Sequence, residues 1–69
     1  MTNYLVIIEG SGDSYSAYVP DLPGCVATGE TVSAVETEIR EAIRFYIEGL
    51  QADGIAVPQP TSLAEYVET

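Results

Sequence analysis

Residues 31–53, TVSAVETEIREAIRFYIEGLQAD, form the stretch that decides the fold. Apolar side chains recur in it at steps of three and four residues, which places them on one face of a helix. Thr31 or Ser33 is positioned to cap its start, the latter with Glu36 at capping-box spacing, and Gly54 stands where a helix stops. The apolar face comprises Val32, Val35, Ile39, Ala42, Ile43, Tyr46, Ile47 and Leu50. The pattern predicts one long helix that packs this face on another layer.

Two strands are predicted before the helix. Residues 3–9, NYLVIIE, are aromatic and β-branched, and they end at the turn residues 10–13, GSGD. Residues 14–19 then alternate between polar and apolar side chains until Pro20, which lacks an amide donor. Both faces of the first strand are apolar, so we expect that strand to be central or covered on both sides. The pattern indicates an antiparallel hairpin.

A third strand and an extended tail complete the expected architecture. Residues 20–24, PDLPG, force a bend, and residues 25–28 are suited to a short strand before the helix. After the helix, Pro58 and Pro60 keep the chain extended. Residues 61–69 fit either a helix start at Ser62 or a short last strand at Tyr66-Val67. We therefore predict a single α+β domain over residues 1–69: a three-stranded antiparallel meander packed on one α-helix (β-β-β-α), with a possible short C-terminal strand.

Chain length and cysteine content point to self-association. A chain of 69 residues buries only about 60% of the surface that its unfolded form exposes, so its stability is marginal. Cys25 is the only cysteine and histidine is absent, which excludes an internal disulfide and a zinc site of the usual Cys/His type. A homo-oligomer is the stabilising device that remains. The apolar run at residues 5–8 is too short for a signal peptide or a membrane span, so we expect a cytoplasmic protein.

The charge balance favours a basic protein partner over nucleic acid. The chain has eleven acidic residues and only two basic ones, Arg40 and Arg44, and its formal net charge is −9. Such a chain cannot neutralise a row of phosphates, so we expect no direct binding of DNA or RNA. The electric field of this negative charge accelerates the diffusional encounter with a basic protein. The alternative is that the charge serves solubility alone.

Little in the sequence supports catalysis. Gly10-Ser11-Gly12 resembles the start of a dinucleotide fingerprint, but Tyr15 stands where a third glycine is needed and a strand follows. No histidine or lysine is present to activate a serine or Cys25, which we interpret as a core residue. A carboxylate-only metal site is the remaining catalytic option, although its candidates point in different directions: Glu9, Glu36, Glu38 and Glu41. We expect no catalytic residue, no metal and no cofactor.

The run YSAYVPDLPGCVATGET, residues 15–31, resembles the signature of the HicB-like antitoxin family. Residues 41–50 of the helix and VPQP at residues 57–60 continue the resemblance over nearly the whole chain. The resemblance implies a core similar to a truncated RNase H fold without its catalytic carboxylates. It also implies that the domain binds and neutralises a small basic mRNA interferase of the HicA type. Larger members carry a C-terminal DNA-binding domain, which we do not expect in a chain that ends at Thr69.

The proline-flanked loop is the expected docking site for such a partner. Two prolines stiffen it, so it loses little entropy on binding, and one of the two tyrosines on the preceding strand should be exposed beside Asp21. The predicted partner-binding residues are Tyr15, Tyr18, Asp21, Leu22, Pro23 and Gly24. On this hypothesis Asp21→Lys weakens the toxin complex by about 2 kcal/mol or more. The alternative for the loop is that it only turns the chain between two strands. The alternatives for the function of the whole protein are an oligomeric binding module with another partner, a metal-dependent nuclease and a small-ligand sensor.

Overall fold

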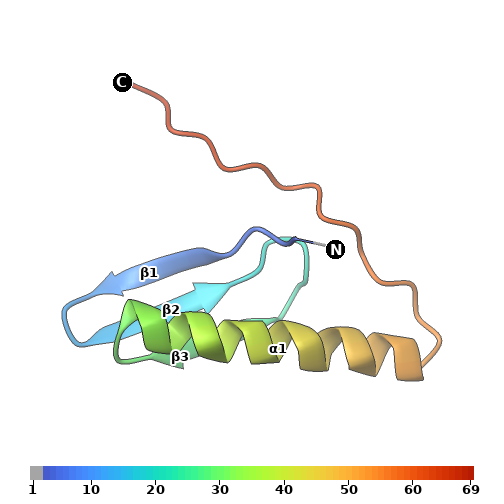
Figure 1. Ribbon diagram of the computed structural model, residues 1–69. Helices are drawn as coiled ribbons and strands as arrows, with labels where there is room; N and C mark the ends of the chain where they lie inside the picture. Colours follow the sequence, from blue (N-terminus) through green and yellow to red (C-terminus); the bar gives the residue numbers. More distant parts are fainter. Residues whose placement is uncertain (1–2) are drawn as a thin grey trace.

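The computed structural model describes residues 3–69 and shows a three-stranded sheet with one helix on one of its faces (Figure 1). The elements are β1 (Ile7–Ser11), β2 (Ser14–Tyr18), β3 (Val26–Gly29) and α1 (Val32–Ala52). Both strand pairs are antiparallel and the strand order is β1-β2-β3. The expectation that the first strand is central is wrong, because β3 pairs with β2 and leaves β1 at an edge of the sheet. The predicted β-β-β-α fold of the α+β class is confirmed.

The first strand is shorter than predicted and begins at Ile7 rather than at Asn3. Ile7 pairs with Tyr18, the last residue of β2, and earlier residues have no strand opposite them. Beyond Tyr18 the chain bends away, because Val19 donates its amide to the Cys25 carbonyl at 3.2 Å and Pro20 has no amide to donate. At the other end β1 continues through Gly10 and Ser11, so the expected four-residue turn is a two-residue connection in which Gly12 takes a φ of 69°.

The helix is one residue shorter at each end than the predicted span. Thr31, one of the two expected caps, is the N-cap, and its hydroxyl accepts a hydrogen bond from the Ala34 amide at 3.0 Å. Asp53 is the C-cap, and Gly54 follows with a φ of 69°, as a helix stop requires.

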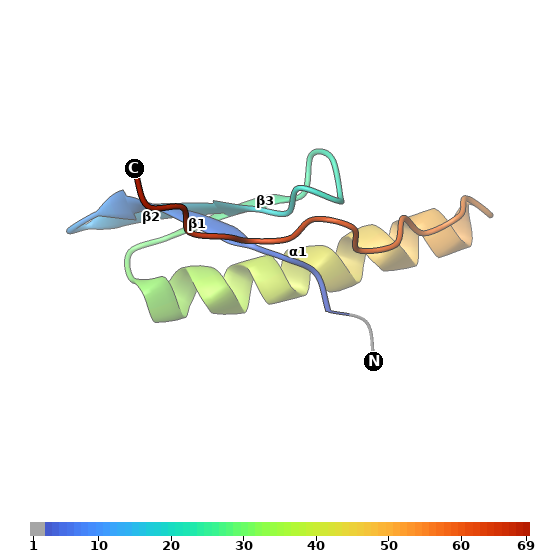
Figure 2. The ribbon, with the colours of Figure 1, turned by 90° about the horizontal axis from the view of Figure 1, so that it is seen from above.

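The core lies between the sheet and the helix. The helix α1 packs on β2 and β3 (Figure 2). On the faces of these strands that point toward it, Ala17 is buried and Tyr15, Ala27 and Gly29 are partly buried. The fully buried residues are Ala17, Val19, Leu22, Cys25, Val35 and Ile39. Most of the predicted helix face contributes, but Val32 is exposed on the first turn. Such a small core agrees with the marginal stability expected from the chain length.

The C-terminal segment forms neither the helix at Ser62 nor the strand at Tyr66-Val67 that the sequence left open. Residues 55–69 contain neither a helix nor a strand, and the last nine are all exposed. Leu63, Tyr66 and Val67 are the large apolar side chains of the last nine residues, with exposed fractions of 84%, 103% and 76%. After residues 61–62, which are hydrogen-bonded to Asp21, the chain runs away from the body of the molecule in an extended form (Figure 1).

The helix α1 is the one helix among the described residues, and it lacks an apolar stretch long enough to cross a membrane.

Candidate protein-binding site

The proline-flanked loop is folded back on itself. The Leu22 amide donates to the Val19 carbonyl and the Cys25 amide donates to the Leu22 carbonyl, both at 3.0 Å. The Leu22 side chain has no exposed surface, because it packs into the core. Of the expected docking residues, Leu22 therefore presents no side-chain surface to a partner, while Pro23 and Gly24 lie exposed at the tip of the loop.

Asp21 is half-buried and is used within the chain. Its Oδ2 accepts hydrogen bonds from the Thr61 and Ser62 amides, both at 3.1 Å. Its Oδ1 accepts from the Thr61 hydroxyl at 2.9 Å and from the Ser62 hydroxyl at 3.0 Å. These donors, above all the Ser62 amide, lower the pKa of Asp21 below its ordinary value, against a smaller desolvation effect that raises it. The loop and residues 61–62 are thus joined through one carboxylate.

The two candidate tyrosines lie on opposite faces of β2, as expected from strand alternation. Tyr15 faces the helix and packs against the core, whereas Tyr18 is 42% exposed on the face that α1 leaves open. Tyr18 stands opposite Ile7 on one side and Val26 on the other, in the register of the sheet. These three side chains form an apolar row across all three strands, which we call the open-face row.

The open-face row adds two residues to the predicted site. Val26 is 64% exposed. Its strand has only four residues, so the alternation of polar and apolar residues alone does not predict on which face of the sheet Val26 lies. Ile7 had no assignable face in the sequence, because both sides of residues 4–8 are apolar. Only the register of β1 and β3 on β2 brings these residues beside Tyr18. The row lies at the end of β2 from which the loop departs, so Tyr18, Pro23 and Gly24 belong to one region of the surface, and Tyr15 and Leu22 do not.

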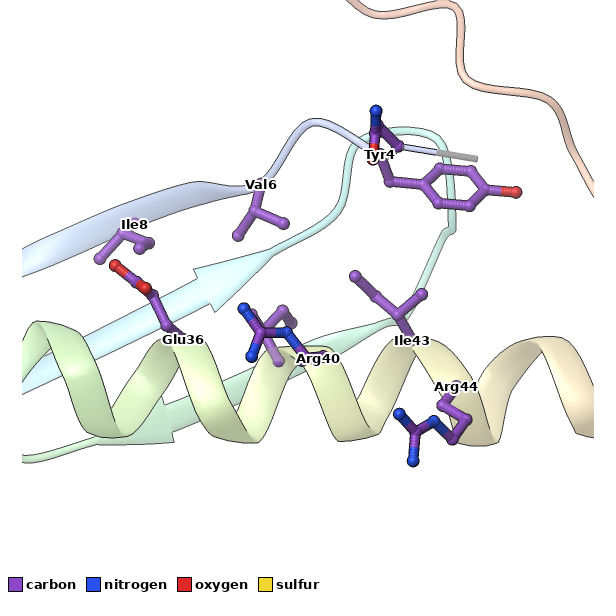
Figure 3. Close-up of a pocket in the computed structure, with 9 residues that line it drawn as sticks. Tyr4, Val6, Ile8, Glu36, Arg40, Ile43 and Arg44 are labelled. Carbon is purple, nitrogen blue, oxygen red and sulfur yellow. The ribbon is translucent and has the colours of Figure 1, made fainter. Parts of the chain in front are cut away.

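A second feature is a groove of about 720 Å³ between α1 and the chain that enters β1 (Figure 3). Val6, Ile8, Ile39 and Ile43 give it an apolar lining, and Arg40 and Arg44 reach it from the helix. Its further lining residues are Asn3, Tyr4 and Glu36. The groove exists because α1 packs over β2 and β3 and touches β1 little, an offset that helical periodicity does not reveal.

The described residues offer little for chemistry. Residues 3–69 contain no group of three or more Asp, Glu or Cys side chains arranged to hold a metal ion. Cys25 is buried, and desolvation raises the pKa of its thiol, which disfavours the nucleophilic thiolate.

The family model described as the HicB-like antitoxin of bacterial toxin-antitoxin systems matches residues 4–69. The chain therefore belongs to the HicB-like antitoxin family, and the resemblance seen in residues 15–31 is confirmed. Membership supports an antitoxin of a toxin-antitoxin system as the general function.

Curated relatives agree with this assignment. A UPF0150 protein of Thermoplasma acidophilum is 42% identical over 57 residues, which cover 81% of this chain and 83% of that protein. A UPF0150 protein of Helicobacter pylori is 40% identical over 50 residues, covering 72% of this chain and 69% of that protein. An uncharacterized 14.9 kDa protein of Haemophilus phage HP1, from its rep-hol intergenic region, is 38% identical over 64 residues. That match covers 93% of this chain but only 48% of the phage protein, so the chain spans about half of that relative's length. No solved structure matches significantly.

Proposed function

We propose that this chain neutralises a small basic toxin of the HicA type by binding it, acting as a non-enzymatic cytoplasmic protein without direct contact to nucleic acid. Family membership over residues 4–69 supports the antitoxin role. The net charge of −9 supports a basic partner, because electrostatic complementarity steers such pairs together and selects among them. We further propose that the domain has a truncated RNase H-like fold.

The single observation that carries the location of the binding site is the uncovered apolar row on the open face of the sheet. Tyr18 and Val26 remain 42% and 64% exposed in a chain of only 69 residues. Tyrosine is favoured at the centre of interfaces, because its rigid ring buries a large area and its hydroxyl can still find a partner. In the proposed complex the open-face row and Pro23 form the apolar centre of the contact.

The surroundings of this row match the expected rim of such a contact. Glu9, Ser16 and Thr28 share the open face with the row, and all three are exposed. Polar and acidic groups around an apolar centre orient a basic surface, while the centre supplies the buried contact that steering alone lacks. Asp21 takes part in this proposal indirectly, since its oxygens already bind Thr61 and Ser62.

The test is calorimetry of the full chain with a purified HicA-type toxin from the same organism. We expect Tyr18→Ala to weaken binding by about 2 kcal/mol, as for an aromatic anchor. Phe45→Ala is the matched control, because Phe45 is 79% exposed but lies on α1, away from the open face. Unchanged affinity of the Tyr18→Ala protein would remove the open face from the interface. Absence of any binding by the unmodified chain would refute the proposed function itself.

A further inference from the structure

The isolated chain exposes more surface than a folded domain of its mass. Its accessible surface is 5265 Å², whereas a folded monomer of 7.4 kDa exposes about 4,200 Å². Its radius of gyration is 13.2 Å, against about 11 Å for a compact domain of this length. Both excesses indicate that part of the chain is shaped to be covered by something else.

The C-terminal arm, residues 63–69, contributes to this excess, because every residue in it is exposed. Leu63, Tyr66 and Val67 lie on it almost wholly exposed. Apolar side chains of this size are rarely left so open together on a monomer unless they mark a contact surface. Two carboxylates, Glu65 and Glu68, are interspersed with these apolar residues along the arm.

The groove between α1 and residues 3–8 has the complementary character. Its lining is apolar, with Val6, Ile8, Ile39 and Ile43 (Figure 3). It lies beside residues 3–8, which lead into β1. Because β1 is an edge strand of the sheet, one side of its main chain is unpaired and can accept an extended segment.

Both basic residues of the whole chain, Arg40 and Arg44, border this groove and are exposed. Within residues 3–69, the one ion pair is that of Arg44 with Glu41 at 3.9 Å, and it is solvent-exposed and therefore weak. The only positively charged side chains of the chain thus border an apolar groove, whose lining also includes the acidic residue Glu36. An extended segment that carries both apolar and acidic residues matches the apolar lining and the two arginines, and the C-terminal arm is such a segment.

We propose that the C-terminal arm of one copy of this chain binds in the groove of a second copy, and that the exchange is reciprocal. Leu63 and Val67, which share one face of the extended arm, cover the apolar lining, and the carboxylates Glu65 and Glu68 lie near Arg40 and Arg44 of the other copy. A two-fold arrangement uses the same two surfaces twice and leaves neither open. This arm exchange stands on the chain alone and does not depend on the proposed toxin.

The anchor of the arm favours a second copy over the arm's own groove. Tyr4, at the end of the groove, donates its hydroxyl hydrogen bond to the Pro58 carbonyl. Asp21 then fixes Thr61 and Ser62 through four hydrogen bonds. Beyond this point the chain leads away from the sheet and the helix (Figure 1). With both points held, the arm projects outward, where another copy can receive it.

Charge reversal with mixing tests the exchange. One variant carries Arg40→Glu and Arg44→Glu, and the other carries Glu65→Arg and Glu68→Arg; all four positions are exposed, so folding should be retained and is checked by circular dichroism. Each variant alone places like charges in the arm contact, and we expect its dimer to weaken by about tenfold or more in sedimentation equilibrium. The second variant is less negative than the natural chain, so overall charge repulsion cannot explain its dissociation. An equimolar mixture should form a heterodimer, because each arm then meets a groove of opposite charge.

The outcomes separate the possible occupants of the groove. Restoration of dimers on mixing supports exchange between copies, as does restoration in a chain that carries all four reversals. An arm that folded onto its own groove would gain nothing from mixing, so two variants that stay monomeric together would overturn the proposal. A natural chain that is monomeric at micromolar concentration, or variants that dimerise as strongly as the natural chain, would overturn it as well.

Discussion

Asp21 and Ser62, 41 residues apart in the sequence, are joined by two hydrogen bonds to the two oxygens of one carboxylate. The Ser62 amide donates to Oδ2 at 3.1 Å, and its hydroxyl donates to Oδ1 at 3.0 Å. The pair connects the loop before β3 to the point where the C-terminal arm begins. A loop that the sequence suggests as a partner surface is thus also the anchor of the arm.

Removing the carboxylate should release the arm without unfolding the domain. We expect Asp21→Ala to accelerate hydrogen exchange at the Thr61 and Ser62 amides, because both amides donate to Asp21. Amides of Val35 and Ile39, in the buried part of α1, should keep their protection. Exchange measured residue by residue by NMR checks this, with Glu30→Ala as a control at an exposed carboxylate before the helix. Equal exchange at Thr61 in all three proteins would contradict an anchoring role.

The same anchor should weaken in acid. Because hydrogen bonds lower the pKa of Asp21 in the folded chain, the ionised carboxylate is favoured there relative to the unfolded chain. Its contribution is complete above the ordinary value of 3.8 and is lost as the pH falls through the lowered pKa. We expect the difference in unfolding free energy between the natural chain and Asp21→Asn to shrink over this range. Urea titrations at a series of pH values measure it, and a difference that grew toward low pH would have the wrong sign.

Local signals in the sequence were enough to predict the order and type of the elements. Helical periodicity with a cap at Thr31 located α1 to within one residue at each end, and alternation up to Pro20 located β2. The start of β1 was missed, because it depends on where β2 ends opposite it and residues 3–6 are as strand-like as those that follow. Pairing length is a property of two strands and is not encoded in either alone.

The candidate site was predicted only in part for a related reason. Alternation predicted that one of Tyr15 and Tyr18 is exposed, and the structure shows that it is Tyr18. Burial of Leu22 depends instead on how the loop folds back against the core, and the nearby Pro20 and Pro23 are exposed. The bond from Asp21 to Ser62 joins distant segments through polar residues, which carry no periodic pattern. Long-range contacts of this kind are visible only in the folded chain.

Burial of Leu22 gives it a structural role that Val26, close to it in sequence, lacks. We expect Leu22→Ala to destabilise the fold by about 2–5 kcal/mol, because it removes a fully buried side chain and leaves a cavity. Val26→Ala is the matched control at a 64% exposed position, where a change within about 0.5 kcal/mol is expected. Denaturation in urea compares the two. A Leu22→Ala protein as stable as Val26→Ala would mean that the loop does not pack into the core.

The thiol of Cys25 should react slowly in the native state. It is buried, and desolvation raises the pKa of its thiol, so both access and the thiolate fraction are reduced at pH 8. We expect an aromatic disulfide reagent to react slowly with the folded chain and rapidly in denaturant. Reaction at the same rate in both states would show that the core around Cys25 opens freely.

Gly29 and Gly49 should respond in opposite ways to the same added methyl group. A Cβ at Gly29 would lie 2.7 Å from the Val35 nitrogen and 3.0 Å from its Cα, both in the backbone of α1, so the helix or β3 must shift. Overpacking of this kind costs about 1–3 kcal/mol. Gly49 lies within α1 with no atom near its Cβ position, so alanine there should stabilise the fold by about 0.5–1 kcal/mol through helix propensity. Urea denaturation of both variants measures the two shifts. A Gly29→Ala protein as stable as Gly49→Ala would mean that β3 and the start of α1 do not pack as closely as the structure shows.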